Sequence, residues 1–185
     1  HCFGNTAAGY NYNRTPMALN DILLALLKIA TDYCYGDRWA IEPMGTMLAG
    51  QTAEALAISV AHPDLLYIGL NCATGPAFMT DHIRALAELS QTRIACVPNA
   101  GLPDEDGNYN ETPEMLRSAL GRFGEHGWLN LIGGCCGTTP SHIQALSNLA
   151  AQTKPRPVPE HHRALYSGID WVEATEDNRP LMVGE

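Results

Sequence analysis

Cysteines are the residues of this chain whose positions best suggest chemistry. Cys72 ends the apolar run LLYIGLNC, and Cys135 and Cys136 stand side by side between glycines in LIGGCCGTTP. Neighbouring residues of a regular strand point to opposite faces, but the flanking glycines let the backbone turn so that both thiols face one point. If Cys72 lies nearby, the three thiolates form a candidate metal site.

Three thiolate ligands favour zinc and leave its fourth position open, as in catalytic zinc sites. Because the thiolates outweigh the charge of the ion, such a site is a weak Lewis acid toward water and is better suited to binding a substrate thiol as its thiolate. The pattern therefore indicates thiol alkylation, not hydrolysis. Buried cysteine also serves as a small apolar residue, and this reading stays open for all three positions.

The other thiols and the histidines give weaker signals. Cys96 lies inside an apolar run and is interpreted as a core residue, while Cys2 and Cys34 have no partner pattern. The dispersed histidines are interpreted as solvated or helix-capping side chains. With 45% hydrophobic residues the chain needs no disulfide framework, and adjacent cysteines pair with each other only in a strained ring. A reduced, cytoplasmic setting is predicted.

Alternating elements must position these thiols. Apolar runs predict strands at 39–46, 65–72, 93–101 and 128–136. Helical periodicity follows each of them, at 52–63, 76–91, 112–127 and 139–152, and an earlier helix is predicted at 17–33. A helix followed by four βα units predicts a parallel sheet, either open and doubly wound or part of a (β/α)8 barrel. In both, chemistry lies at the carboxyl ends of the strands.

The amino-acid composition and one proline-rich run limit the partners, the membrane association and the domain organisation that the chain could have. The chain carries 11 Lys and Arg against 20 Asp and Glu, and this acidic balance disfavours nucleic acid as a partner. No apolar stretch is long enough to span a membrane, and the first residues do not form a signal peptide. A proline-rich run at 154–159 predicts a stiff linker, and the C-terminal segment as a whole is expected to be irregular. We therefore divide the chain into an unassigned segment (1–16), an α/β region (17–152), which the resemblance described next makes a partial barrel, and a linker with its tail (153–185).

Four segments resemble the homocysteine-binding domain of cobalamin-dependent methionine synthases, and they follow that family's order: EPMGTMLAGQT (42–52), IGLNCATGP (68–76), PNAGLPDEDGNY (98–109) and IGGCCGTTPSHI (132–143). The resemblance implies a TIM-type (β/α)8 barrel with zinc held by Cys72, Cys135 and Cys136. It also implies methyl transfer from methylcobalamin to homocysteine, giving methionine. The tail resembles the linker toward a folate-binding domain, so cobalamin-binding and folate-binding domains of the same polypeptide are the implied partners.

Two alternatives stay open beside this reading. Homocysteine methyltransferases that use betaine or S-methylmethionine share the zinc barrel, but they lack such a continuation after it. The chain could also be a non-catalytic binding or assembly module with structural cysteines.

The sequence departs from the family at its start, because a complete domain supplies further strands before residue 39. We therefore expect the second half of a barrel, with little or no methyl transfer by this chain alone. Asn71, Asn99 and Thr46 lie at strand ends and are predicted to bind substrate, although asparagine also stabilises loops. Glu42 is interpreted as a structural or supporting carboxylate.

Overall fold

A computed structural model describes residues 50–61, 65–72, 74–160 and 163–181, and the fold is stated for these residues alone. Helices and strands alternate along the first part of the chain. They are α2 (Ala53–Ser59), β1 (Tyr67–Asn71), α3 (Pro76–Leu89), β2 (Arg93–Val97), α4 (Pro113–Glu125), β3 (Leu131–Ile132) and α5 (Pro140–Ala150). The predicted strand at 39–46, the helix at 17–33 and the segment 1–16 lie outside the described residues.

A threonine cap, a proline in the first turn, or both begin each of these helices. Thr52 accepts a hydrogen bond from the amide of Ala55 at the start of α2, and Thr112 accepts one from Met115 at the start of α4. Proline stands in the first turn of α3, α4 and α5, where its missing N–H costs no hydrogen bond. The four predicted helices in this region are confirmed; α3, α4 and α5 are slightly shorter than their periodic segments, and α2, at Ala53–Ser59, is clearly shorter than the predicted 52–63.

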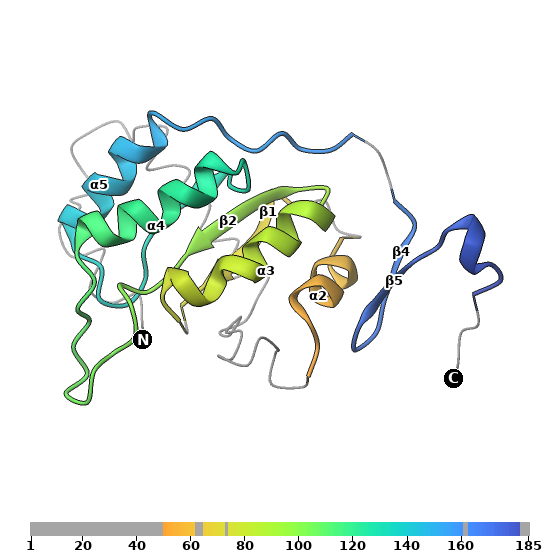
Figure 1. Ribbon diagram of the computed structural model, residues 1–185, viewed down its shortest axis with the longest axis horizontal. Helices are drawn as coiled ribbons and strands as arrows, with labels where there is room; N and C mark the ends of the chain where they lie inside the picture. Colours follow the sequence, from red (N-terminus) through yellow and green to blue (C-terminus); the bar gives the residue numbers. More distant parts are fainter. Residues whose placement is uncertain (1–49, 62–64, 73, 161–162, 182–185) are drawn as a thin grey trace, which may run out of the picture. The chain divides into compact units, whose positions relative to one another are not determined.

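The three strands form one parallel sheet in the order β1-β2-β3. This confirms the parallel sheet predicted for the described part of the chain. Figure 1 labels the first two of these strands, β1 and β2, beside α3. Because β2 lies between the other two, the ends of β1 and β3 flank it on one edge of the sheet. The predicted strand at 128–136 is too long, since β3 covers only Leu131–Ile132 and the turn follows at Cys136 and Gly137.

A hydrophobic core joins one face of the sheet to the helices. Alternate strand residues are buried there, together with apolar side chains of α3, α4 and α5; the central members are Ile68, Leu70, Ile94, Cys96, Ile83, Leu86, Leu116, Leu120, Phe123 and Leu146. Cys96 is fully buried and its Sγ lies 3.8 Å from Sδ of Met79, which confirms its interpretation as a core residue. Burial raises the pKa of this thiol, so it is inert.

The proline-rich segment after α5 has neither helix nor strand, as predicted, but it is anchored at one residue. Arg156 is only 5% exposed, and its guanidinium donates to the carbonyl oxygens of Ala87, Ser90 and Thr92 around the end of α3. Its backbone amide donates to the carbonyl of Leu129. The segment that crosses from α5 to β4 in Figure 1 is thus fixed at this point.

The tail is not wholly irregular, which corrects the sequence-based expectation. Strands β4 (Leu165–Ser167) and β5 (Trp171–Glu173) form an antiparallel hairpin, followed by a 3-10 helix, Glu176–Asn178. The hairpin contacts α2, where Ser59 and Ser167 share a hydrogen bond of 2.8 Å. Strands of three residues are too short for alternation to stand out in the sequence. Among the described residues, no helix is both long and apolar enough to cross a membrane.

Candidate metal centre

Cys72 follows directly after β1 in an unusual backbone conformation. Its amide donates to the carbonyl of Val97 at 3.0 Å and extends the pairing of β1 with β2 by one residue. Its φ angle is 59°, in the left-handed region, which costs an L-residue about 1–2 kcal/mol. This conformation turns the chain at the sheet edge, and strain of this kind occurs preferentially at functional sites.

The Cys135–Cys136 loop is held against the segment that follows β2. The amide of Cys135 donates to the carbonyl of Pro98 at 2.8 Å, and the amide of Cys136 donates to Oδ1 of Asn99 at 3.2 Å. The carbonyl of Cys136 in turn accepts from the amide of Ala100. These bonds set both cysteines beside the end of β2, opposite Cys72.

Glycine is required where this loop turns away again. Gly137 has a φ angle of 77°, and a Cβ at this position would overlap the side chain of Tyr109. The predicted role of the flanking glycines in turning the backbone agrees with the geometry at Gly137.

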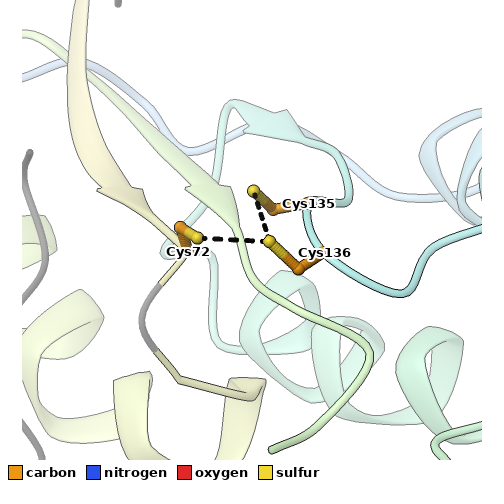
Figure 2. Close-up of side chains that lie close together, drawn as sticks. All are labelled: Cys72, Cys135 and Cys136. Carbon is orange, nitrogen blue, oxygen red and sulfur yellow. Dashed lines mark hydrogen bonds between the residues drawn. The ribbon is translucent and has the colours of Figure 1, made fainter. Parts of the chain in front are cut away.

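The three thiols converge on one point (Figure 2). Sγ of Cys136 lies 3.5 Å from Sγ of Cys72 and 3.9 Å from Sγ of Cys135, and all three sulfurs are within 4.8 Å of one another. Zinc–sulfur bonds of about 2.3 Å in tetrahedral geometry place neighbouring sulfurs about 3.8 Å apart. The donor type and the spacing therefore both fit a thiophilic metal ion. In the described part of the chain, no other group of three or more His, Cys, Asp or Glu side chains has metal-binding geometry.

Three thiols this close together ionise fully only when a cation lies among them. The pKa of Cys135 is raised, first by its hydrogen bond with Cys72 and then by burial and the neighbouring thiols. Without a positive charge among them, the sulfurs share protons and do not all ionise. No disulfide joins Cys72, Cys96, Cys135 and Cys136, so the thiols are in the oxidation state that binds metal.

The predicted substrate-binding residues lie in different places. Asn99 is 3% exposed and supports the Cys136 amide, so it is directly connected to the cluster. Asn71 is the last residue of β1, next to Cys72, and is half-buried. Thr46 and Glu42 lie outside the described residues.

One buried residue of the loop region after the cysteine pair did not stand out in the sequence as part of a site. His142, interpreted there only as a solvated or capping side chain, is 5% exposed; its Nδ1 accepts from the amide of Thr139, which is the capping role. Its Nε2 also lies 2.9 Å from the carbonyl oxygen of Glu111. The available signal was the Thr-x-x-His spacing, which resembles a capping box with histidine in place of glutamate or glutamine.

Comparison with known proteins agrees with this arrangement. A sequence model of the family described as homocysteine S-methyltransferase matches residues 26–150, which is more than half of the chain. The match takes in the helices and strands from α2 to α5 and all three clustered cysteines. The chain therefore belongs to the homocysteine S-methyltransferase family.

Proposed function

We propose that this chain is the zinc-bearing part of a homocysteine S-methyltransferase of the methionine synthase type. Cys72, Cys135 and Cys136 hold the metal, and homocysteine is methylated on sulfur to give methionine. The observation that carries the proposal is the convergence of three thiols from two loops at the carboxyl edge of a parallel sheet, within the region of the family match. The α/β order with a parallel sheet supports placing this region in the second half of a (β/α)8 barrel.

Each residue of the cluster has a defined task in this proposal. The three cysteines bind the metal as thiolates, and Asn99 fixes the backbone of Cys136. A bound zinc ion would hold the homocysteine sulfur as a thiolate at neutral pH. The substrate sulfur then attacks the methyl carbon as the bond from that carbon to its donor breaks. Asn71 lies next to Cys72 and is proposed, with Thr46, to contact the rest of the substrate.

We propose methylcobalamin, carried by another domain of the same polypeptide, as the methyl donor. The support is the order and length of the segments that resemble methionine synthases, together with the anchored segment at 154–160 leading out of the α/β region. The folate-binding domain of such a polypeptide would restore the donor, and the cytoplasm would be its compartment. Betaine and S-methylmethionine are the competing donors.

Metal analysis tests the cysteine cluster. Purified, reduced chain is expected to bind about one zinc ion, and Cys72→Ala is expected to lose tight binding because two thiolates hold zinc far less well than three. Cys96→Ala is the matched control, because Cys96 is buried in the core away from the cluster. Full zinc affinity in Cys72→Ala would contradict the proposed ligand set.

Two further measurements test the substrate and the donor. Addition of homocysteine is expected to bring a fourth sulfur to the metal, seen in the zinc-edge X-ray absorption spectrum. An unchanged spectrum would favour a non-catalytic module with structural cysteines. Methyl transfer to homocysteine is then assayed in the full-length natural polypeptide with each of the three donors, and only methylcobalamin is expected to support it.

A further inference from the structure

We infer that His142 is a positioning residue for the metal centre, acting through its hydrogen bond to the backbone of Glu111. This inference rests on the metal site proposed above and names a residue outside its ligand set. The side chain of His142 contacts no ligand cysteine in any hydrogen bond described here, so its effect must pass through the loops that it joins.

The geometry of His142 fixes which ring nitrogen carries the proton. Nδ1 accepts from the amide of Thr139 at 3.1 Å, so this nitrogen presents its lone pair. Nε2 lies 2.9 Å from the carbonyl oxygen of Glu111, a pure acceptor, so Nε2 must carry the hydrogen. His142 therefore uses one nitrogen as an acceptor and the other as a donor, and it joins two loops.

Those two hydrogen bonds complete a closed path of hydrogen bonds and backbone that contains Cys136, called the circuit below. The amide of Glu111 donates to the carbonyl of Ala100 at 3.2 Å, and the amide of Ala100 donates to the carbonyl of Cys136 at 2.8 Å. From Cys136 the chain runs through Gly137 and Thr138 to Thr139, whose amide returns to His142. The loop that bears two of the three thiols is thus tied at both ends to the loop after β2.

A second set of bonds braces the same loop. The hydroxyl of Thr138 donates to the carbonyl of Cys135 at 2.6 Å, and Asn99 accepts from the amide of Cys136. Thr138, Asn99 and His142 are all buried, so water does not readily replace these contacts. The bond from Nε2 to Glu111 is the link in the circuit that one side-chain change can remove while the helix cap is kept.

His142→Gln and His142→Glu separate the two roles of the ring. Both side chains can accept from the Thr139 amide as the third helical residue of a capping box. Only glutamine has an N–H that can reach the Glu111 carbonyl. Since supporting contacts around metal ligands are worth 10–100-fold in affinity, His142→Glu is expected to bind zinc at least about 10-fold more weakly than His142→Gln. The added carboxylate would attract the cation directly, so this direct effect of its charge on zinc is opposite to the expected loss of affinity.

Zinc dissociation constants of the full chain are measured by competition with a chromophoric chelator, with unfolding followed by circular dichroism in the same buffer. Cobalt(II) spectra of each variant report whether the tetrahedral thiolate site is distorted. Leu146→Ala is the control, because Leu146 lies in the core on the same helix, and its loss lowers stability without touching the circuit. It is expected to keep the zinc affinity and the cobalt spectrum of the parent chain.

Three results would overturn the inference. His142→Glu and His142→Gln could bind zinc equally well, which would show that the Glu111 bond is not needed. Leu146→Ala could lose as much affinity as His142→Glu at equal loss of stability, which would reduce His142 to a structural residue. Failure of the parent chain itself to bind zinc would overturn the proposed metal site as well, so the two failures are told apart.

Discussion

Cys72 combines a strained backbone conformation with a side chain of the candidate metal site. An alanine or serine there would bear the same left-handed φ angle of 59° without the thiol, so the strained position serves the sulfur and not the turn alone. Glycine would relieve the strain but would remove the ligand. The side chain is therefore explained by its position beside Cys136, 3.5 Å away between sulfurs.

The carboxyl of Glu111 affects the free energy of folding in a way that depends on pH. Its Oε2 is buried without a hydrogen-bond partner, and the side chain lies against Gly75 and Gly101. Burial raises the pKa of this carboxyl above its ordinary value of 4.5, although the electrostatic influence of the neighbouring His142 opposes the shift. A carboxyl whose pKa is higher in the folded than in the unfolded chain stabilises the fold below pH 4.5 and loses this contribution as pH rises through the folded value.

Glu111→Gln therefore removes a buried carboxylate whose ionisation disfavours folding at neutral pH. We expect the free energy of unfolding of the variant, relative to the parent chain, to increase as pH rises from 4 to 7, measured by urea denaturation at each pH. The exposed Glu114, in the first turn of α4, provides the control variant Glu114→Gln. A difference between Glu111→Gln and the parent chain that stays constant across this range would contradict the assignment.

Arg156 acts at the scale of elements, because it joins the segment after α5 to the end of α3. Its Nη2 donates at 2.7 Å to Ser90, which is the C-cap of α3, and it also bonds Ala87 in the last turn. A cation at the C-terminus of a helix is favoured by the helix dipole as well as by these bonds. Burial lowers the pKa of the guanidinium, but the carbonyl oxygens around it compensate for the lost water.

Arg156→Met keeps much of the apolar side chain and removes the donors. We expect the free energy of unfolding to fall by about 2–4 kcal/mol, because buried carbonyls lose charged partners. We also expect faster cleavage by trypsin after Arg163, whose backbone is then less restrained. Lys154→Met, at an exposed position of the same segment, is the control and should leave both measurements nearly unchanged. Equal stability of the two variants would show that Arg156 does not anchor the segment.

Helices and strands with a regular apolar period could be predicted from the sequence, and so could the convergence of Cys72 with Cys135 and Cys136, because these cysteines stand at the ends of such strands. Contacts of single residues that belong to no such pattern could not. The sequences of the helices show helical periodicity, and those of β1 and β2 are apolar runs. The glycines around Cys135 and Cys136 predicted a turn at the end of a strand. Arg156 stands alone between prolines, and the carbonyls that it binds lie 64 to 69 residues earlier. The bond from His142 to Glu111 spans 31 residues and involves a backbone atom, which no side-chain pattern records.

At the scale of the whole molecule, the three thiols connect parts of the chain that folding must bring together from afar. Cys72 and Cys136 are 64 positions apart, and β2 with α3 and α4 lies between them in the sequence. A metal ion that binds all three sulfurs therefore favours the folded chain, because the unfolded chain seldom holds the ligands in place. The acidic balance of the chain, with a formal charge of -9, further favours a cation.

Zinc is thus expected to raise the stability of the α/β region as a unit. Free zinc at about 100 times its dissociation constant should add about 2.7 kcal/mol to the free energy of unfolding, less whatever affinity the unfolded thiols retain. Thermal unfolding followed by circular dichroism, with zinc or with a chelator, measures the difference. Cys72→Ser should show little response, since one of the three ligands is lost, whereas Cys96→Ala should respond like the parent chain. If zinc stabilised Cys72→Ser as much as the parent chain, the ion would be bound elsewhere and the connection between the ends of β1 and β3 would not exist.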